Sequence, residues 1–160
     1  MRELVFGVLL APLLVLAAVP PRRGQASEEA VFEAVLREQI EEYLDGSARR
    51  AGTVICLAVN QGTGPQSARP QLMKRFASDR AVRPAAACDP RPEGAIEGMT
   101  RMPAVVLTAG PIDWVAEDEA WVSATYFRSA RSSASRRYRV VRQSGGWVSL
   151  GPILLDGPAS

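Results

Sequence analysis

Residues 136–154 read RRYRVVRQSGGWVSLGPIL, and this stretch is the clearest guide to the fold. Two runs rich in β-branched and aromatic residues, Arg136–Gln143 and Trp147–Leu154, flank the sequence Ser144-Gly145-Gly146. Such residues favour strands, whereas a small polar residue followed by glycines favours a tight turn. The stretch therefore predicts a β-hairpin.

Two further strands are predicted before this hairpin. Ala104–Ile112 and Ala120–Arg128 have strand composition, and the acidic segment 116–119 between them predicts a turn. Residues 129–135 are small and polar, which favours a loop. We therefore expect a meander of four strands in the C-terminal half.

The N-terminal half begins with a predicted amphipathic helix. Ser27 can cap it, and Gly46 suits its C-terminal end. Apolar residues recur at helical spacing at positions 31, 32, 35, 36, 40, 43 and 44. The charged residues between them are expected to face mostly outward: Glu33, Arg37, Glu38, Glu41 and Glu42.

The segment between this helix and the meander has mixed character. Thr53–Asn60 (TVICLAVN) is apolar on both faces, which is typical of an interior strand. Pro70 suits the first turn of a short helix. Ala81–Cys88 is predicted to be an edge strand because its Pro84 lacks an N–H, and residues 89–102 a long loop.

Together these elements predict the α+β class. We expect an N-terminal amphipathic helix and a short second helix packed on a curved antiparallel sheet of about five to six strands. The length of residues 27–160 fits one domain.

The order of these elements resembles a known group of folds. A leading amphipathic helix, followed by a meander that ends Tyr138-x-Val140 and then Gly146-Trp147-Val148, is similar to small exported bacterial proteins with NTF2-like or cystatin-like rolls. The resemblance covers most of residues 27–160 as element order. It implies a cavity between helix and sheet, and it implies no particular site residue.

Residues 1–26 have the pattern of a secretory signal peptide. Arg2 precedes an uncharged run over residues 4–19, and Gly24-Gln25-Ala26 offers small residues for cleavage before Ser27. The run is shorter than the roughly 20 apolar residues that span a bilayer. The alternative is an uncleaved signal anchor that tethers the protein to a membrane.

The chain has two cysteines, Cys56 and Cys88. In an exported protein an even number of cysteines predicts a disulfide, and two cysteines allow only one pairing. Two buried free thiols are the alternative. The predicted location is the periplasm or outside the cell.

Composition excludes several function classes. The chain contains no His, which excludes Ser-His-Asp and Cys-His catalysis and the usual His-based zinc sites. It has 19 basic and 17 acidic residues; residues 1–26 hold three arginines and one glutamate, so residues 27–160 carry 16 of each. This balance argues against nucleic-acid binding. We predict no cofactor and no metal.

The densest acidic cluster is Asp113 with Glu117-Asp118-Glu119. Carboxylates so grouped can bind a divalent cation or hydrolyse a glycosidic bond. The competing interpretation is a solvated turn between two strands, and the cluster lacks the spacing of a calcium-binding loop.

Arginines gather between residues 128 and 142. They could bind phosphate, an anionic glycan or an acidic partner. Strand alternation sends Arg136 and Arg142 to one face and Arg137 and Arg139 to the other, so a surface strand balanced by the glutamates of the first helix also explains them. The candidate anion-binding or partner-binding residues are Arg128, Arg136, Arg137, Arg139 and Arg142.

The sequence therefore favours an exported, non-enzymatic binding or interaction module of the cell envelope. Its partner is expected to be another envelope protein or a small ligand, bound by a helix–sheet cavity or by the basic stretch. Two alternatives stay open: a carboxylate-dependent hydrolase built on Asp113, Glu117 and Glu119, and a membrane-tethered accessory subunit.

Overall fold

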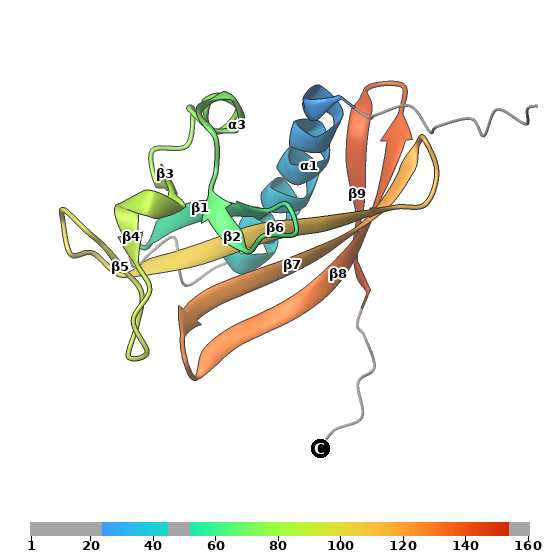
Figure 1. The fold of residues 1–160 in the computed structure, drawn as a ribbon. Helices are drawn as coiled ribbons and strands as arrows, with labels where there is room; N and C mark the ends of the chain where they lie inside the picture. The colour runs from blue at the N-terminus through green and yellow to red at the C-terminus, as the bar shows by residue number, and fades with distance from the viewer. Residues whose placement is uncertain (1–23, 45–51, 154–160) are drawn as a thin grey trace, which may run out of the picture.

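The computed structural model describes residues 24–44 and 52–153. One long helix lies against a large curved sheet, so the fold is mixed α+β, as predicted (Figure 1). In chain order the elements are α1 (Gln25–Leu44), β1 (Val54–Asn60), β2 (Pro65–Ser67), α3 (Pro70–Lys74), β3 (Val82–Pro84), the 3₁₀ helix η1 (Ala85–Ala87), β4 (Cys88–Asp89), β5 (Ile96–Glu97), β6 (Ala104–Trp114), β7 (Glu119–Ser129), β8 (Ser132–Gln143) and β9 (Gly146–Ile153).

The predicted C-terminal meander is confirmed. Strands β6, β7, β8 and β9 pair antiparallel in sequence order. In the β8–β9 hairpin Gln143 lies opposite Gly146, so Ser144 and Gly145 form a two-residue turn. The predicted loop over residues 129–135 is much shorter than expected, because β8 already begins at Ser132.

The sheet is not purely antiparallel, which corrects the prediction. It has seven strands in the order β2-β1-β6-β7-β8-β9, with β3 also paired to β1. Strand β1 runs parallel to β6, from Val54 opposite Ala104 to Val59 opposite Ala109, and parallel to β3. Parallel neighbours need a long crossover, and residues 61–103 supply it between β1 and β6.

Helix α1 covers one face of the sheet and forms the main core with it. Its Val31, Val35 and Leu36 are fully buried against β-strand residues such as Leu57 and Val140. The helix begins at Gln25, two residues before the predicted Ser27, and the predicted end at Gly46 lies outside the described residues. The short helix α3 starts at Pro70 as predicted and buries Leu72 in the same core.

The other face of β1 is covered by the segment around β4 and β5. Val54 and Cys56 point to this face and pack with Ala95 and Ala104 in a second, smaller core. The disulfide between Cys56 and Cys88 is present, with a Cα–Cα distance of 6.3 Å, and it fastens this segment to the sheet. The continuous apolar run of β1 is therefore explained by burial on both faces.

The predicted signal segment lies almost wholly outside the described residues, since these begin at residue 24. Among the helices that the structure describes, none combines the length and apolar character required to cross a membrane.

Candidate functional site

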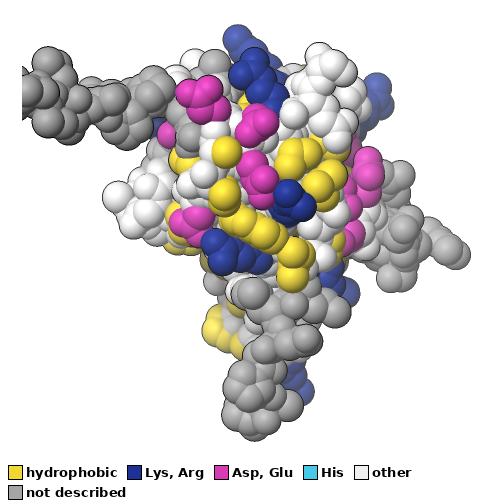
Figure 2. Space-filling view, turned by 90° about the vertical axis from the view of Figure 1, so that its right-hand side faces the viewer, with side chains coloured by type: hydrophobic (Ala, Val, Ile, Leu, Met, Phe, Trp, Pro, Cys, Tyr) yellow, Lys and Arg dark blue, Asp and Glu magenta, His cyan; other side chains and the backbone are white. Residues whose placement is uncertain are grey.

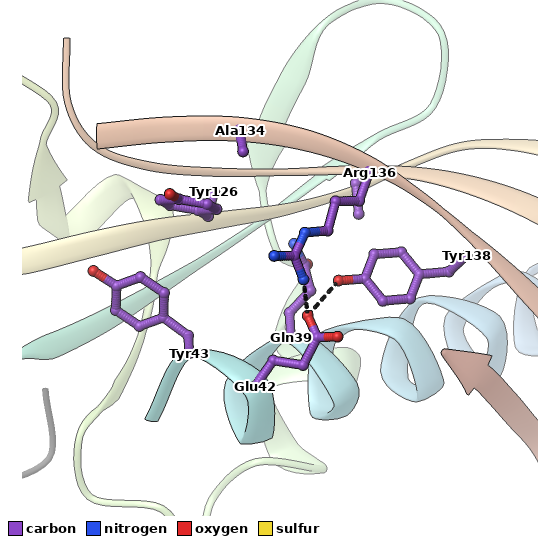
Figure 3. Close-up of a pocket in the computed structure, with 8 residues that line it drawn as sticks. Gln39, Glu42, Tyr43, Tyr126, Ala134, Arg136 and Tyr138 are labelled. Atoms are coloured by element: carbon purple, nitrogen blue, oxygen red, sulfur yellow. Dashed lines mark hydrogen bonds and ion pairs between the residues drawn. The ribbon is translucent and has the colours of Figure 1, made fainter. Parts of the chain in front are cut away.

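A pocket of about 190 Å³ lies between the C-terminal half of α1 and the face of β7 and β8 that the helix covers. We call it the helix–sheet pocket; Figure 3 shows side chains from the helix and from both strands around it. It is lined by Gln39, Glu42, Tyr43, Ala124, Tyr126, Ala134, Arg136 and Tyr138.

Glu42 is the polar centre of this pocket. Its Oε2 accepts a hydrogen bond from the phenolic oxygen of Tyr138 at 3.0 Å and from Nη1 of Arg136 at 2.7 Å. Both donors come from β8, so the carboxylate ties the helix to the sheet (Figure 3). Burial raises the pKa of the Tyr138 phenol well above its ordinary value, and the hydrogen bond to Glu42 and its charge raise it further.

Two tyrosine rings form an aromatic wall of the pocket. The ring centroids of Tyr43 on α1 and Tyr126 on β7 lie 5.5 Å apart, with the planes tilted by 50°. Both rings lie on the opposite side of the pocket from Tyr138 (Figure 3). Tilted aromatic pairs at this separation attract each other, and their exposed faces can pack against a planar group.

Gln39 also lines the pocket, and its side-chain oxygen is a buried acceptor without a hydrogen-bond partner in the described part of the chain. Its residue exposure is only 6%, and its Nε2 donates to the backbone oxygen of Thr125 at 3.2 Å. Its Oε1 is buried and has no hydrogen-bond partner among the described residues. Leaving a buried acceptor unpaired costs about 1–3 kcal/mol. Because this oxygen is buried, a ligand could donate a hydrogen bond to it only if the Gln39 side chain turned toward the pocket.

Glu42 was predicted to face mostly outward, and the residue is indeed exposed. Its carboxylate nevertheless turns toward the pocket, where it contacts Arg136 and Tyr138, which the sequence did not predict. Val35, Gln39 and Glu42 follow one another at helical spacings of four and three residues, so all three lie on one side of α1. The sequence signal that could have identified the pocket is that Gln39 and Glu42, both polar, continue the helix face on which Val35 lies.

The predicted basic residues do not form one patch. Arg136 faces the helix–sheet pocket. On the opposite face of the sheet, Arg137 is paired with Asp113 at 2.8 Å and lies over the ring of Trp121, and Arg139 is paired with Glu119 at 2.9 Å. The side chains of Arg128 and Arg142 have no ion pair with any described residue.

Figure 2 shows the side of the molecule on which β9 lies. Acidic and basic side chains lie next to one another there, around a band of hydrophobic side chains. On strand β9 itself, the side chains of Val148, Leu150 and Ile153 are 40% to 52% exposed.

Arg137 and Arg139 are neutralised by their acidic partners, so they present little net charge to a ligand.

The acidic cluster does not bring its carboxylates together as one site. Asp113 and Glu119 each bind a different arginine of β8. The hydrogen bond from Arg139 lowers the pKa of the Glu119 carboxyl. Glu117 lies exposed in the turn between β6 and β7. No group of metal-binding side chains is present in the described ranges 24–44 and 52–153.

Comparisons of the chain with known protein families, curated proteins and solved structures found no match.

Proposed function

We propose that this chain is an exported, non-enzymatic binding module of the cell envelope, and that the helix–sheet pocket holds its ligand. Export is supported by the apolar N-terminal segment and by the disulfide, since disulfides persist in oxidising compartments. We also propose that the fold is related to NTF2-like or cystatin-like rolls, in which a cavity lies between helix and sheet.

The observation that carries the proposal is a pocket that combines an aromatic wall, made by Tyr43 and Tyr126, with the carboxylate of Glu42. Ligand pockets typically combine apolar or aromatic walls with a few fixed polar groups. Glu42 is already held by Arg136 and Tyr138, so it supplies a fixed acceptor without a large change in side-chain position.

These features define the class of ligand. It is a small molecule with a planar group that packs against Tyr43 or Tyr126 and with an N–H or O–H that donates to Glu42. The pocket volume of about 190 Å³ is below the roughly 300–1,000 Å³ of drug-sized sites, so the ligand is smaller than a typical drug.

The test is a native mass spectrum of the protein recovered from its own cell envelope without reductant. We expect a chain that starts at Ser27, is two hydrogens lighter than the reduced form, and carries a bound small molecule. A bare chain in every preparation would contradict ligand binding. A full-length chain that needs detergent would contradict export by cleavage and support a membrane-tethered subunit.

A further inference from the structure

A second pocket, of about 530 Å³, lies where the segment around β5 crosses the turn between β7 and β8. Backbone hydrogen bonds hold the two parts together: Ala95 N–H donates to Arg128 O at 2.7 Å, and Ala130 N–H donates to Pro92 O at 2.9 Å. The walls of this pocket are therefore fixed relative to each other, although they are far apart in the sequence.

Two arginines from these two parts line the pocket, Arg101 and Arg128. Both are exposed, and neither side chain has a hydrogen bond or ion pair with the described residues. Arg136, Arg137 and Arg139, in contrast, are all neutralised by a carboxylate. One carboxylate, from Glu93, also lines the pocket, so the two guanidinium groups leave it with a net positive charge.

Arg101 is held in an unusual backbone conformation. Its φ is 62°, in the left-handed region that residues other than glycine, asparagine and aspartate rarely adopt. Such a conformation is unfavourable for arginine and persists only where the surroundings enforce it. Buried Glu97 does so here: its Oε2 accepts hydrogen bonds at 2.6 Å from the N–H and the hydroxyl of Thr100, and its backbone oxygen accepts one from Arg101 N–H at 2.9 Å.

We propose that this second pocket binds a phosphate group through Arg101 and Arg128. Guanidinium groups match the oxygen geometry of phosphate and can donate two parallel hydrogen bonds each. Ser129 and Ser132 also line the pocket and carry hydroxyls that can donate to further phosphate oxygens. This site is separate from the helix–sheet pocket and does not depend on the function proposed for it.

The phosphate can belong to a soluble molecule or to a lipid headgroup. Met99, two residues before Arg101, is 92% exposed, and Met102, the residue after it, is 39% exposed; neither lines the pocket itself. Exposed apolar side chains in the same segment as a phosphate site could enter the boundary layer of a membrane, so the test must separate the two sources.

The first measurement is a titration of the folded protein with inorganic phosphate, followed by nuclear magnetic resonance of the arginine Nε–Hε groups and of the amide of Ala95. We expect saturable shifts. Arg101→Gly keeps the left-handed backbone accessible and removes the guanidinium, and Arg128→Gln removes the second one. Each should weaken phosphate binding about tenfold, since a charge-assisted hydrogen bond is lost.

The matched control is Arg131→Gln, which removes the same charge from the same turn but does not line the pocket. It should change phosphate affinity less than about twofold, because exposed charges act weakly at a distance in salt. Arg101→Asn provides a second variant with the same backbone tolerance. Equal weakening by Arg131→Gln and by the pocket variants, or shifts that never saturate, would overturn the proposal.

The second measurement is sedimentation with phosphatidylcholine vesicles that contain or lack phosphatidylglycerol. If the source is a lipid headgroup, binding requires the anionic lipid, is lost in Arg101→Gly and Arg128→Gln, and is weakened by Met99→Gln. If the source is soluble, phosphate binds and vesicles do not. Absence of both kinds of binding, or vesicle binding that survives the loss of both arginines, would overturn the proposal.

Discussion

The phenolic oxygen of Tyr138 lies 3.0 Å from Oε2 of Glu42, a residue 96 positions earlier in the chain. The ring of Tyr138 is part of the main core and is only 1% exposed, whereas its hydroxyl reaches the helix–sheet pocket. The same contact therefore stabilises the packing of α1 on the sheet and fixes the position of the pocket carboxylate.

Replacing Tyr138 by Phe tests this contact. The hydroxyl is lost while the ring stays in the core, so we expect the free energy of unfolding to fall by about 1–2 kcal/mol in urea titrations. Tyr43→Phe is the matched control, since its hydroxyl has no hydrogen bond with a described residue. Equal losses in the two variants would show that the bond to Glu42 contributes nothing specific.

The raised pKa of Tyr138 predicts a pH dependence. An ordinary tyrosine has a pKa of 10.0, and the folded phenol keeps its proton above that pH while the unfolded chain releases it. The contribution of Tyr138 to the free energy of unfolding is thus complete below pH 10 and decreases as the pH rises above about 10. The stability difference between wild type and Tyr138→Phe should shrink over this range. If the stability difference between the two proteins stayed constant above pH 10, the raised pKa of Tyr138 would be contradicted.

Much of the fold could be predicted because its signals are local. The β8–β9 hairpin depends on adjacent strands and the turn at Ser144-Gly145, and the helix α1 depends on a repeating apolar face. The parallel pairing of β1 with β6 could not be predicted in the same way, since it joins segments that are separated by residues 61–103. Its one local sign was the unbroken apolar run of β1, which is typical of strands buried on both faces.

The site was predicted less well. The basic stretch contains Arg136, which lines the pocket, but alternation along a strand does not reveal which acidic partners the neighbouring strands bring. Asp113 and Glu119 reach Arg137 and Arg139 across the sheet, and these long-range pairings are decided by strand register. Gln39 was missed because one polar residue on an apolar helix face is a weak signal without knowledge of its opposite wall.

The disulfide provides a further prediction. Cys56 and Cys88 are 32 residues apart, and closing a loop of this length is worth about 3–4 kcal/mol in the chain-entropy treatment. The variant with both cysteines replaced by Ala should lose this much stability in urea titrations. Reductant should destabilise the wild type to a similar degree and leave the variant unchanged. A wild type insensitive to reductant under unfolding conditions would contradict a structural role.

A tryptophan substitution that fills the helix–sheet pocket tests whether this pocket holds the ligand. Ala134 points into the pocket (Figure 3). Its neighbour on β8, Ser133, is exposed. In native mass spectra of protein recovered from the cell envelope, we expect Ala134→Trp to lose the bound small molecule and Ser133→Trp to keep it, with both variants folded. Retention of the molecule by Ala134→Trp would contradict the account, and so would its loss from both variants.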